Sequence, residues 1–337
     1  MTALRWVVAL AVLTTACSSG DDDPDPTPDP GSCAATTGHA AYSTDGLQAW
    51  SVLPRATDSC IDARLDSHFV FIDPAVAAKN RLFLFLPGSG AIPQYYRLIA
   101  RTAAREGYHA IGLSYFNAAA VASLCSGQGP DCHGPVRLEI LTGTDASSRI
   151  AVSRANSIEN RLLRLLAYMQ EIDPGRDWSQ FVVNGAVDWS RVSVAGHSQG
   201  GGHALFIAQR HLVQRASAYG SGGDLIGQQP VTWVTEPFAT PTDRIYGFSS
   251  VNDEAVSAVG AVNAWTAIGL DAFGPATSVD DAAAPWGGSH MLLTSAVPLR
   301  PELVNAPNHN VVVVDVNTPV AGGVPVFASV WREMGMP

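Results

Sequence analysis

The sequence is poor in basic residues: it has 20 against 30 acidic ones, and Lys79 is its only lysine. Binding to nucleic acid needs a basic surface that neutralises phosphates, so the net charge of −10 argues against such a partner. Gly-Lys-Ser/Thr does not occur, which excludes a Walker-type nucleotide-binding loop. No apolar run reaches the roughly 20 residues that a membrane-spanning helix needs. The remaining composition, 47% apolar and 15% charged, is typical of a globular protein.

The N-terminus has the pattern of a secretory signal. Arg5 precedes an apolar run from Trp6 to Leu13, which is too short to span a bilayer. The run ends in small residues before Cys17, and this ending resembles a bacterial lipobox, in which the cysteine is lipidated and becomes the mature N-terminus. The resemblance predicts that residues 1–17 are a signal peptide and that the protein is a lipid-anchored, membrane-bound lipoprotein on the periplasmic face or cell surface. A secreted protein with an ordinary cleaved signal is the alternative.

Residues 18–32 follow the signal and contain only Ser, Thr, Gly, Asp and Pro. A segment of this composition cannot bury enough apolar surface to offset its ordering entropy, so we expect a disordered tether. Its aspartate run lacks the glycine and the glutamate of a calcium loop. We therefore expect residues 33–337 to form a single domain behind the tether, and the sequence does not indicate its oligomeric state.

Four cysteines remain beyond Cys17: Cys33, Cys60, Cys125 and Cys132. An even number in an exported chain predicts two disulfides. We expect the nearest-neighbour pairing, Cys33–Cys60 and Cys125–Cys132, although the other connectivities stay open. A four-cysteine metal site is the alternative, but no Cys-x₂-Cys pair occurs and no His/carboxylate spacing suggests a metal, so we expect none.

From about residue 68, apolar runs alternate with amphipathic segments. Strands are expected at His68–Ile72, Arg81–Leu86, Tyr108–Tyr115, Arg191–Ala195, Ala216–Tyr219, Arg244–Phe248, Met291–Leu293 and Val311–Val314. Helices are expected at Pro93–Arg105, Ile158–Met169, Gln199–Gln209, about Glu254–Ile268 and Val326–Met334. This alternation predicts an α/β domain whose mostly parallel sheet carries helices on both faces. Residues 116–145 interrupt it and are expected to form an irregular insertion.

The segment Gly196-His197-Ser198-Gln199-Gly200 lies between an expected strand and an expected helix. Gly-x-Ser-x-Gly in this context predicts a nucleophile elbow, a sharp turn that raises the serine Oγ above the edge of the sheet. The helix that follows adds a positive dipole and free N–H groups, which can stabilise a developing oxyanion.

The elbow and the strand before it resemble the α/β-hydrolase superfamily, and the resemblance covers about residues 68–335. It implies an α/β-hydrolase fold and a catalytic triad in the order Ser, acid, His, with Ser198 as the nucleophile. The acid is expected after the strand Arg244–Phe248, where Asp253 is the first choice and Glu254 the second.

The resemblance places the catalytic histidine on a loop after the last major strand. His309 is the first choice. His290, which opens the strand at Met291, is the second choice, and its alternative role is that of a strand-end histidine near the site. His197 and His203 belong to the elbow and its helix, where packing or hydrogen bonding is the expected role.

The resemblance also implies an oxyanion hole made of two backbone N–H groups. One is expected from Gln199, directly after the nucleophile. The other is expected from the loop Pro87–Gly90, where such enzymes often carry His-Gly and this chain has Pro-Gly-Ser-Gly. Ser89 is the first choice and Gly90 the second, and a plain structural turn is the alternative.

These residues predict an exported serine hydrolase that cleaves a small-molecule or polymeric carboxylic ester through an acyl-enzyme, without a cofactor. Tyr95, Tyr96, Phe116 and Trp286 are the expected pocket walls. A peptidase or an acyltransferase on the same fold is an alternative, as is a non-catalytic surface lipoprotein that keeps the scaffold as a binding module. A complete Ser, acid and His in the right order argues against the binding module.

Overall fold

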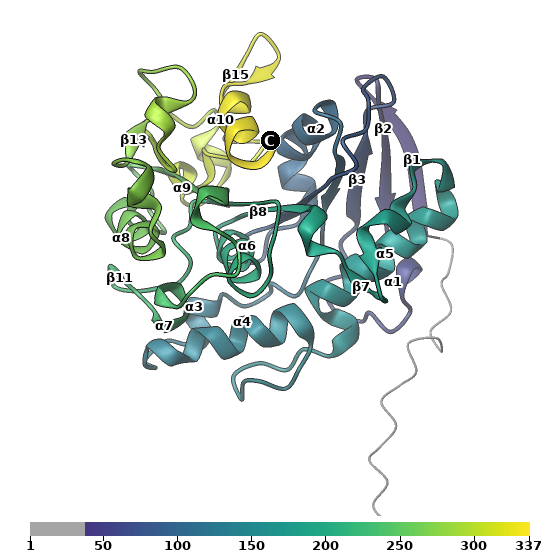
Figure 1. Cartoon of the computed structure of the whole chain (residues 1–337), viewed down its shortest axis with the longest axis horizontal. Helices are drawn as coiled ribbons and strands as arrows, with labels where there is room; N and C mark the ends of the chain where they lie inside the picture. The colour runs from purple at the N-terminus through teal and green to yellow at the C-terminus, as the bar shows by residue number, and fades with distance from the viewer. Residues whose placement is uncertain (1–37) are drawn as a thin grey trace, which may run out of the picture. The chain divides into compact units, whose positions relative to one another are not determined.

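The computed structural model describes residues 38–337 of the chain, and its centre is a 10-stranded sheet (Figure 1). In spatial order the strands are β1 (His39–Thr44), β2 (Leu47–Val52), β3 (His68–Ile72), β5 (His109–Gly112), β4 (Leu82–Leu86), β8 (Val192–His197), β9 (Arg215–Tyr219), β12 (Ile245–Ser250), β14 (Met291–Thr294) and β13 (Thr277–Ser278). Every neighbouring pair from β5 to β13 is parallel, whereas β1, β2, β3 and β5 are joined by antiparallel pairing.

Helices cover both faces of this sheet. One face carries α2 (Arg97–Arg105) and α10 (Ala328–Gly335), which contact each other (Figure 1). The other carries α1 (Pro54–Thr57), α4 (His133–Thr142), α5 (Ile158–Ile172), α6 (Gln199–Arg210) and α8 (Ala258–Ile268). The loops hold the short helices α3 (Val121–Leu124), α7 (Thr232–Thr235) and α9 (Pro307–Asn310) and the hairpins β6–β7 (Val182–Val183, Ala186–Val187), β10–β11 (Leu225–Ile226, Gln229–Pro230) and β15–β16 (Val320–Ala321, Val324–Pro325).

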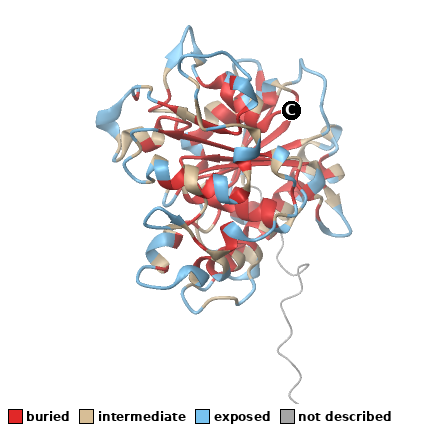
Figure 2. Ribbon diagram, turned by 60° about the vertical axis from the view of Figure 1, so that its left-hand side comes forward, coloured by how far each residue is buried: buried red, intermediate tan, exposed pale blue. Residues whose placement is uncertain are grey.

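Strand β4 shows how the sheet divides the hydrophobic core. All five of its side chains are buried, and they alternate between the two layers. Leu84 packs with the side chains of α4, α5 and α6, whereas Phe83 and Phe85 pack with those of α2 and α10. Burying each such side chain contributes about 1.5–3 kcal/mol. Figure 2 shows the result: the buried residues are concentrated in the strands and on the helix faces that meet them.

The predicted fold class is confirmed: the chain has an α/β-hydrolase fold, with a mostly parallel central sheet and helices on both faces. The expected strand His68–Ile72 is observed with the same bounds as β3, and the expected helix Gln199–Gln209 is α6 with one more residue. The sheet also contains an N-terminal hairpin that we did not expect, β1–β2. Its local signal is Asp45-Gly46, a dipeptide that favours a tight hairpin turn.

Two expected elements differ from the structure. Val311–Val314 is not a strand but continues the helical turn of α9, with the N–H of Val314 donating to the carbonyl of Asn310 at 2.9 Å. Pro307 favours that turn, and the valines become buried against α10 without joining the sheet. The expected irregular insertion, residues 116–145, contains α3 and the 10-residue helix α4. Both differences arise because tertiary packing outweighs β-propensity and turn composition.

The disulfide between Cys125 and Cys132 is present, with 5.8 Å between its Cα atoms. It joins the end of α3 to the turn that leads into α4. Cys33 lies outside the described residues, as do Cys17, the expected signal and the tether, so the Cys33–Cys60 pairing and the lipid anchor stay predictions. Within residues 38–337 no helix is both long and apolar enough to cross a bilayer, and no cluster of side chains suited to holding a metal ion occurs in that range.

Candidate active site

Ser198 lies at a sharp turn between β8 and α6. Its backbone angles are φ 53° and ψ −119°, a strained conformation for a residue with a side chain. The turn is held from both sides, because the Ser198 N–H donates to the carbonyl of Tyr219 at 2.8 Å and its carbonyl accepts from Gly202 at 3.0 Å. A Cβ atom on Gly196 or Gly200 would overlap neighbouring backbone, so only glycine fits at the two flanking positions. The strand–turn–helix geometry that the motif predicts is therefore present.

Ser198 lines a cavity of about 720 Å³ that His309 also lines. Much of the remaining wall is small or aliphatic: Ala91, Ala120, Val121, Ala122, Ala255 and Val256. Of the aromatic residues expected in the pocket wall, Tyr95 and Tyr96 line the cavity, whereas Phe116 and Trp286 are not among its lining residues. Trp286 is buried in the core instead. Most of the exposed area of the cavity wall is therefore apolar, with polar side chains set among the aliphatic ones.

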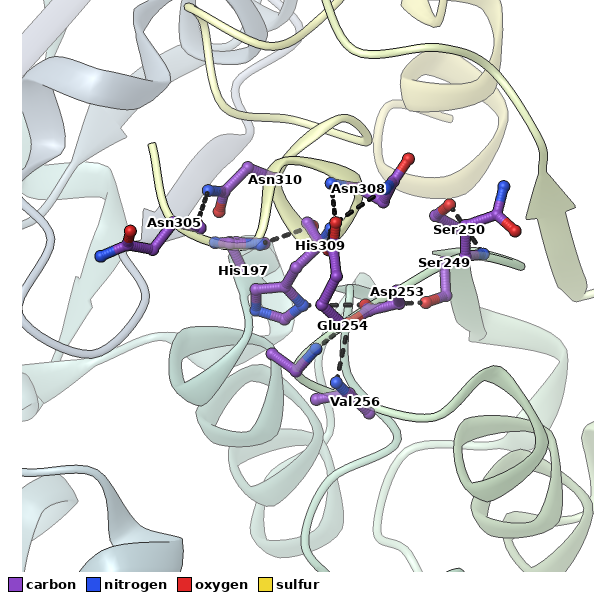
Figure 3. A network of polar contacts seen from close by, with 12 residues as sticks. His197, Ser249, Ser250, Asp253, Glu254, Val256, Asn305, Asn308, His309 and Asn310 are labelled. Atoms are coloured by element: carbon purple, nitrogen blue, oxygen red, sulfur yellow. Dashed lines mark hydrogen bonds and ion pairs between the residues drawn. The ribbon is translucent and has the colours of Figure 1, made fainter. Parts of the chain in front are cut away.

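His309 and Asp253 are hydrogen-bonded through their side chains (Figure 3). The distance from His309 Nδ1 to Asp253 Oδ2 is 2.8 Å, and the Asp253 side chain is fully buried. The second oxygen of Asp253 accepts the backbone N–H groups of Ala255 and Val256 at 2.8 and 2.7 Å. This arrangement keeps the proton of a neutral His309 on Nδ1 and leaves Nε2 free to accept another.

Glu254, the second choice for the acid, contacts the backbone of α9 at Asn308 and His309. Its carboxylate accepts the N–H of His309 at 2.9 Å and the N–H and side-chain amide of Asn308 at 3.1 and 2.7 Å (Figure 3). Partial burial acts to raise the pKa of Glu254, but these hydrogen bonds outweigh it and hold the pKa below its usual range. Asp253, and not Glu254, is the carboxylate at the imidazole ring.

His290, the second choice for the histidine, lies at the opposite end of β12 from Asp253. Its Nδ1 is 3.0 Å from the carbonyl of Ile245, the first residue of β12, and its ring stacks between Tyr246 and Phe273. It is not among the residues that line the cavity. The structure therefore brings Ser198, Asp253 and His309 to one region and leaves His290 apart from them.

The loop after β4 contains both residues expected to donate to an oxyanion. The N–H of Gly90, the second choice, donates to the carbonyl of Asn117 at 2.8 Å and is not available to a ligand. The backbone N–H groups of Ser89 and Gln199 have no hydrogen-bond partner within residues 38–337, and both residues line the cavity. The Ser89 side chain donates to Gln199 Oε1 at 2.7 Å and links the two donor residues directly.

Asn117 fixes this loop in place. Its Nδ2 donates to the carbonyls of Gly88 at 2.6 Å and Ala91 at 2.9 Å, and the residue is 1% exposed. The hydroxyl of Tyr115 donates to the carbonyl of Pro87 at 2.9 Å. Sequence reasoning did not find these contacts, because both side chains come from the segment after β5 and no local pattern connects them to the loop.

A buried ion pair lies in the cavity wall beside the nucleophile. The guanidinium of Arg137, from α4, binds both oxygens of Asp224 at 2.5 and 2.7 Å and donates to the carbonyl of Gln199 at 3.1 Å. Gly202 leaves room for it, since a Cβ there would overlap the guanidinium. Burial acts to raise the pKa of Asp224, but Arg137 outweighs it and the pKa stays low. Sequence analysis did not predict this pair, because its members are 87 residues apart.

Comparisons with known proteins do not identify a family for this chain. No protein-family model matches the chain, and no curated protein matches it. Among solved structures, the chain is similar to a cold-adapted esterase from an Arctic intertidal metagenomic library, with a TM-score of 0.37 and 12% identity. The match covers 68% of this chain and 82% of that one.

Proposed function

We propose that this chain is a serine hydrolase that cleaves carboxylic esters through an acyl-enzyme on Ser198. One observation carries the proposal: Ser198, at a strained turn, lines the same cavity as His309, and the ring of His309 is held by Asp253 at 2.8 Å. A strained serine, a histidine with a free Nε2 and a buried carboxylate are the three parts that nucleophilic acyl transfer needs.

In the proposed reaction, His309 Nε2 accepts the proton of Ser198 as Oγ attacks the ester carbonyl carbon. The imidazolium that forms is stabilised by Asp253, whose second oxygen is held by two backbone N–H groups. His309 then gives the proton to the alcohol as it leaves, and the acyl group stays on Ser198. Water, activated by the same histidine, releases the acid.

The negative charge of the tetrahedral intermediate is assigned to the N–H groups of Ser89 and Gln199. The Gln199 N–H is the first in α6, a 12-residue helix whose dipole points its positive end at the site. Gly90 is excluded as the second donor because its N–H already donates to Asn117. One such donor contributes about 10²–10³ in rate.

Uncharged esters fit this cavity best. Among residues 38–337, Arg137 and Asp224 are the only Arg, Lys, Asp or Glu side chains in its lining, and they neutralise each other. A charged acyl group would therefore meet no unpaired countercharge in a mostly apolar space, and its desolvation would go uncompensated. We expect p-nitrophenyl butyrate to be hydrolysed with a higher kcat/KM than the p-nitrophenyl monoester of succinic acid.

Labelling with a fluorophosphonate probe tests the reaction. We expect wild-type protein and His290→Ala to be labelled, and Ser198→Ala and His309→Ala not to be. His290 is a matched control because it is a buried histidine in the same domain that lies away from the cavity. A folded wild-type protein that resists the probe would refute the hydrolase and favour a binding module. Labelling without ester hydrolysis would favour a peptidase or an acyltransferase.

We also propose export and anchoring through a lipid on Cys17. The Cys125–Cys132 disulfide supports export, because disulfides persist mainly in oxidising compartments. Fractionation of cells that express Cys17→Ser tests the anchor. We expect this variant to leave the membrane fraction, and a variant that stays there would refute lipidation at Cys17.

A further inference from the structure

His197, the residue before the proposed nucleophile, lies between the rings of Tyr96 and His309. Its ring centroid is 5.6 Å from that of Tyr96 and 4.6 Å from that of His309. Both ring nitrogens have a partner. Nδ1 is 3.0 Å from the Tyr96 hydroxyl. Nε2 is 3.1 Å from the backbone carbonyl of His309, and Figure 3 shows this second contact. Tyr96 and His197 are each 2% exposed, so water does not compete for these contacts.

The direction of each hydrogen bond follows from its partner. The carbonyl of His309 can only accept, so Nε2 of His197 carries the proton and donates. Burial, and to a smaller extent the charge of His309, lower the pKa of His197 well below 6.5, so the ring is neutral and Nδ1 accepts. The Tyr96 hydroxyl therefore donates to Nδ1, and its oxygen accepts the backbone N–H of Gly88 at 3.2 Å.

The result is one continuous chain of hydrogen bonds between two segments that each carry a proposed functional residue. It runs from the Gly88 N–H to the Tyr96 hydroxyl, to the His197 ring and to the His309 carbonyl. Gly88 directly precedes Ser89, the proposed oxyanion donor, and His309 is the proposed base. The chain thus connects two loops that must keep a fixed distance while charge passes between the serine, the histidine and the oxyanion.

We propose that Tyr96 and His197 are positioning residues that set the loop Pro87–Gly90 (the oxyanion loop) and the α9 segment that bears His309 relative to each other. This inference rests on the proposed hydrolase function. Neither side chain transfers a proton in the reaction, because Tyr96 donates to His197 and His197 donates to a backbone carbonyl. Their effect is on geometry, and a misplacement of about 1 Å at a reacting group lowers rates by about 100-fold.

Tyr96→Phe is the direct test, because it removes one hydroxyl and keeps the buried ring. We expect kcat for p-nitrophenyl acetate, per site titrated with the fluorophosphonate, to fall about 10- to 100-fold while KM stays within about twofold. Tyr108→Phe is the matched control. Tyr108 is 1% exposed, and its hydroxyl donates to the main-chain oxygen of Pro337 at 2.7 Å, away from the cavity. We expect Tyr108→Phe to keep the wild-type kcat.

A double-mutant cycle separates a connected chain from two independent packing contributions. We expect the combination of Tyr96→Phe with His197→Phe to lose no more kcat than the more impaired single variant, because either change breaks the same chain. Losses that multiply would refute the chain. His197→Gln can still donate to the His309 carbonyl, so we expect it to retain more activity than His197→Phe.

The outcomes distinguish this inference from the function on which it rests. A wild-type protein that neither reacts with the probe nor hydrolyses esters would overturn the proposed function, and the positioning role with it. If the wild type is active and Tyr96→Phe keeps its kcat per titrated site, only the positioning role is overturned. Should His197→Phe fail to fold, Tyr96→Phe and His197→Gln still decide the question.

Discussion

Glu254 accepts the backbone N–H of His309 at 2.9 Å, so this carboxylate holds the main chain of the histidine and not its ring. The adjacent carboxylate, Asp253, holds the ring through Nδ1 at 2.8 Å. Two acids that are neighbours in the sequence thus fix two different features of one residue. Glu254 fixes the position of the His309 backbone, and Asp253 fixes the orientation of its imidazole ring.

This division predicts unequal effects of two amide substitutions. In Asp253→Asn the new amide can donate to Nδ1 and favour the wrong tautomer, so we expect kcat to fall by about 10³–10⁴. In Glu254→Gln the remaining carbonyl oxygen can still accept the His309 N–H, so we expect a loss of less than about tenfold. Steady-state hydrolysis of p-nitrophenyl acetate, normalised by fluorophosphonate titration, measures both. Equal losses would contradict the division of roles.

The oxyanion loop predicts that removing the Ser89 side chain has little effect. Its proposed contribution is a backbone N–H, which Ser89→Ala retains, so we expect kcat to fall less than about tenfold. Asn117→Ala removes the Nδ2 that holds the carbonyls of Gly88 and Ala91. We expect a larger loss of kcat for this variant and a destabilisation of about 1–3 kcal/mol. If Ser89→Ala proves the more damaging change, the donor is the hydroxyl.

The Arg137–Asp224 pair predicts a large stability effect from a small substitution. Asp224→Asn leaves the Arg137 guanidinium, which is 2% exposed, without its countercharge. We expect the free energy of unfolding to fall by about 3–5 kcal/mol in urea titrations at neutral pH. The exposed pair Arg154–Glu159 supplies the control, since Glu159→Gln should change stability by about 0–1 kcal/mol. Similar values for the two variants would refute this account of the pair.

Buried histidines predict a loss of stability in mild acid. Burial lowers the pKa of His68, His197 and His203 well below 6.5 in the folded protein, whereas the unfolded chain protonates near 6.5. Their contribution to the free energy of unfolding is therefore complete above that pH and is lost as pH falls, by up to about 1.4 kcal/mol each between pH 7.5 and 5.5. Asp315 opposes this in part, because burial raises its pKa to about 7.

Urea unfolding at the two pH values tests this prediction, and His203→Phe is the informative variant. Neither ring nitrogen of His203 has a hydrogen-bond partner in the described part of the chain, so an apolar ring can replace it. We expect the acid-induced loss of unfolding free energy to be smaller in this variant than in the wild type, by up to about 1.4 kcal/mol. An equal loss in both proteins would show that His203 does not titrate on unfolding.

Much of the fold could be predicted from the sequence, because it depends on patterns of residues that lie close together along the chain. The continuous apolar run of β4 indicates a strand buried on both faces, because side chains on either side of the sheet then pack into an apolar layer. The elbow at Ser198 could also be predicted, since its strain, its flanking glycines and its helix all lie within a few residues. Such features depend on neighbours along the chain, which the sequence displays directly.

Other features were decided only by tertiary structure. The apolar run Val311–Val314 does not itself distinguish a strand from the buried turn that it forms, because both bury the valines. His290 and His309 both stand at suitable positions in the sequence, and only the packing of α9 against the end of β12 brings His309 to Asp253.

The contacts that hold the site join residues far apart in the chain. Tyr96 and His197 are 101 residues apart, and Arg137 and Asp224 are 87 apart. By itself, the sequence determined most of the elements, the fold class and the proposed nucleophile, because short-range patterns encode strands, helices and turns. The partners of each buried polar group were decided by the folded chain, since burial requires every such group to find a partner wherever the packing brings one.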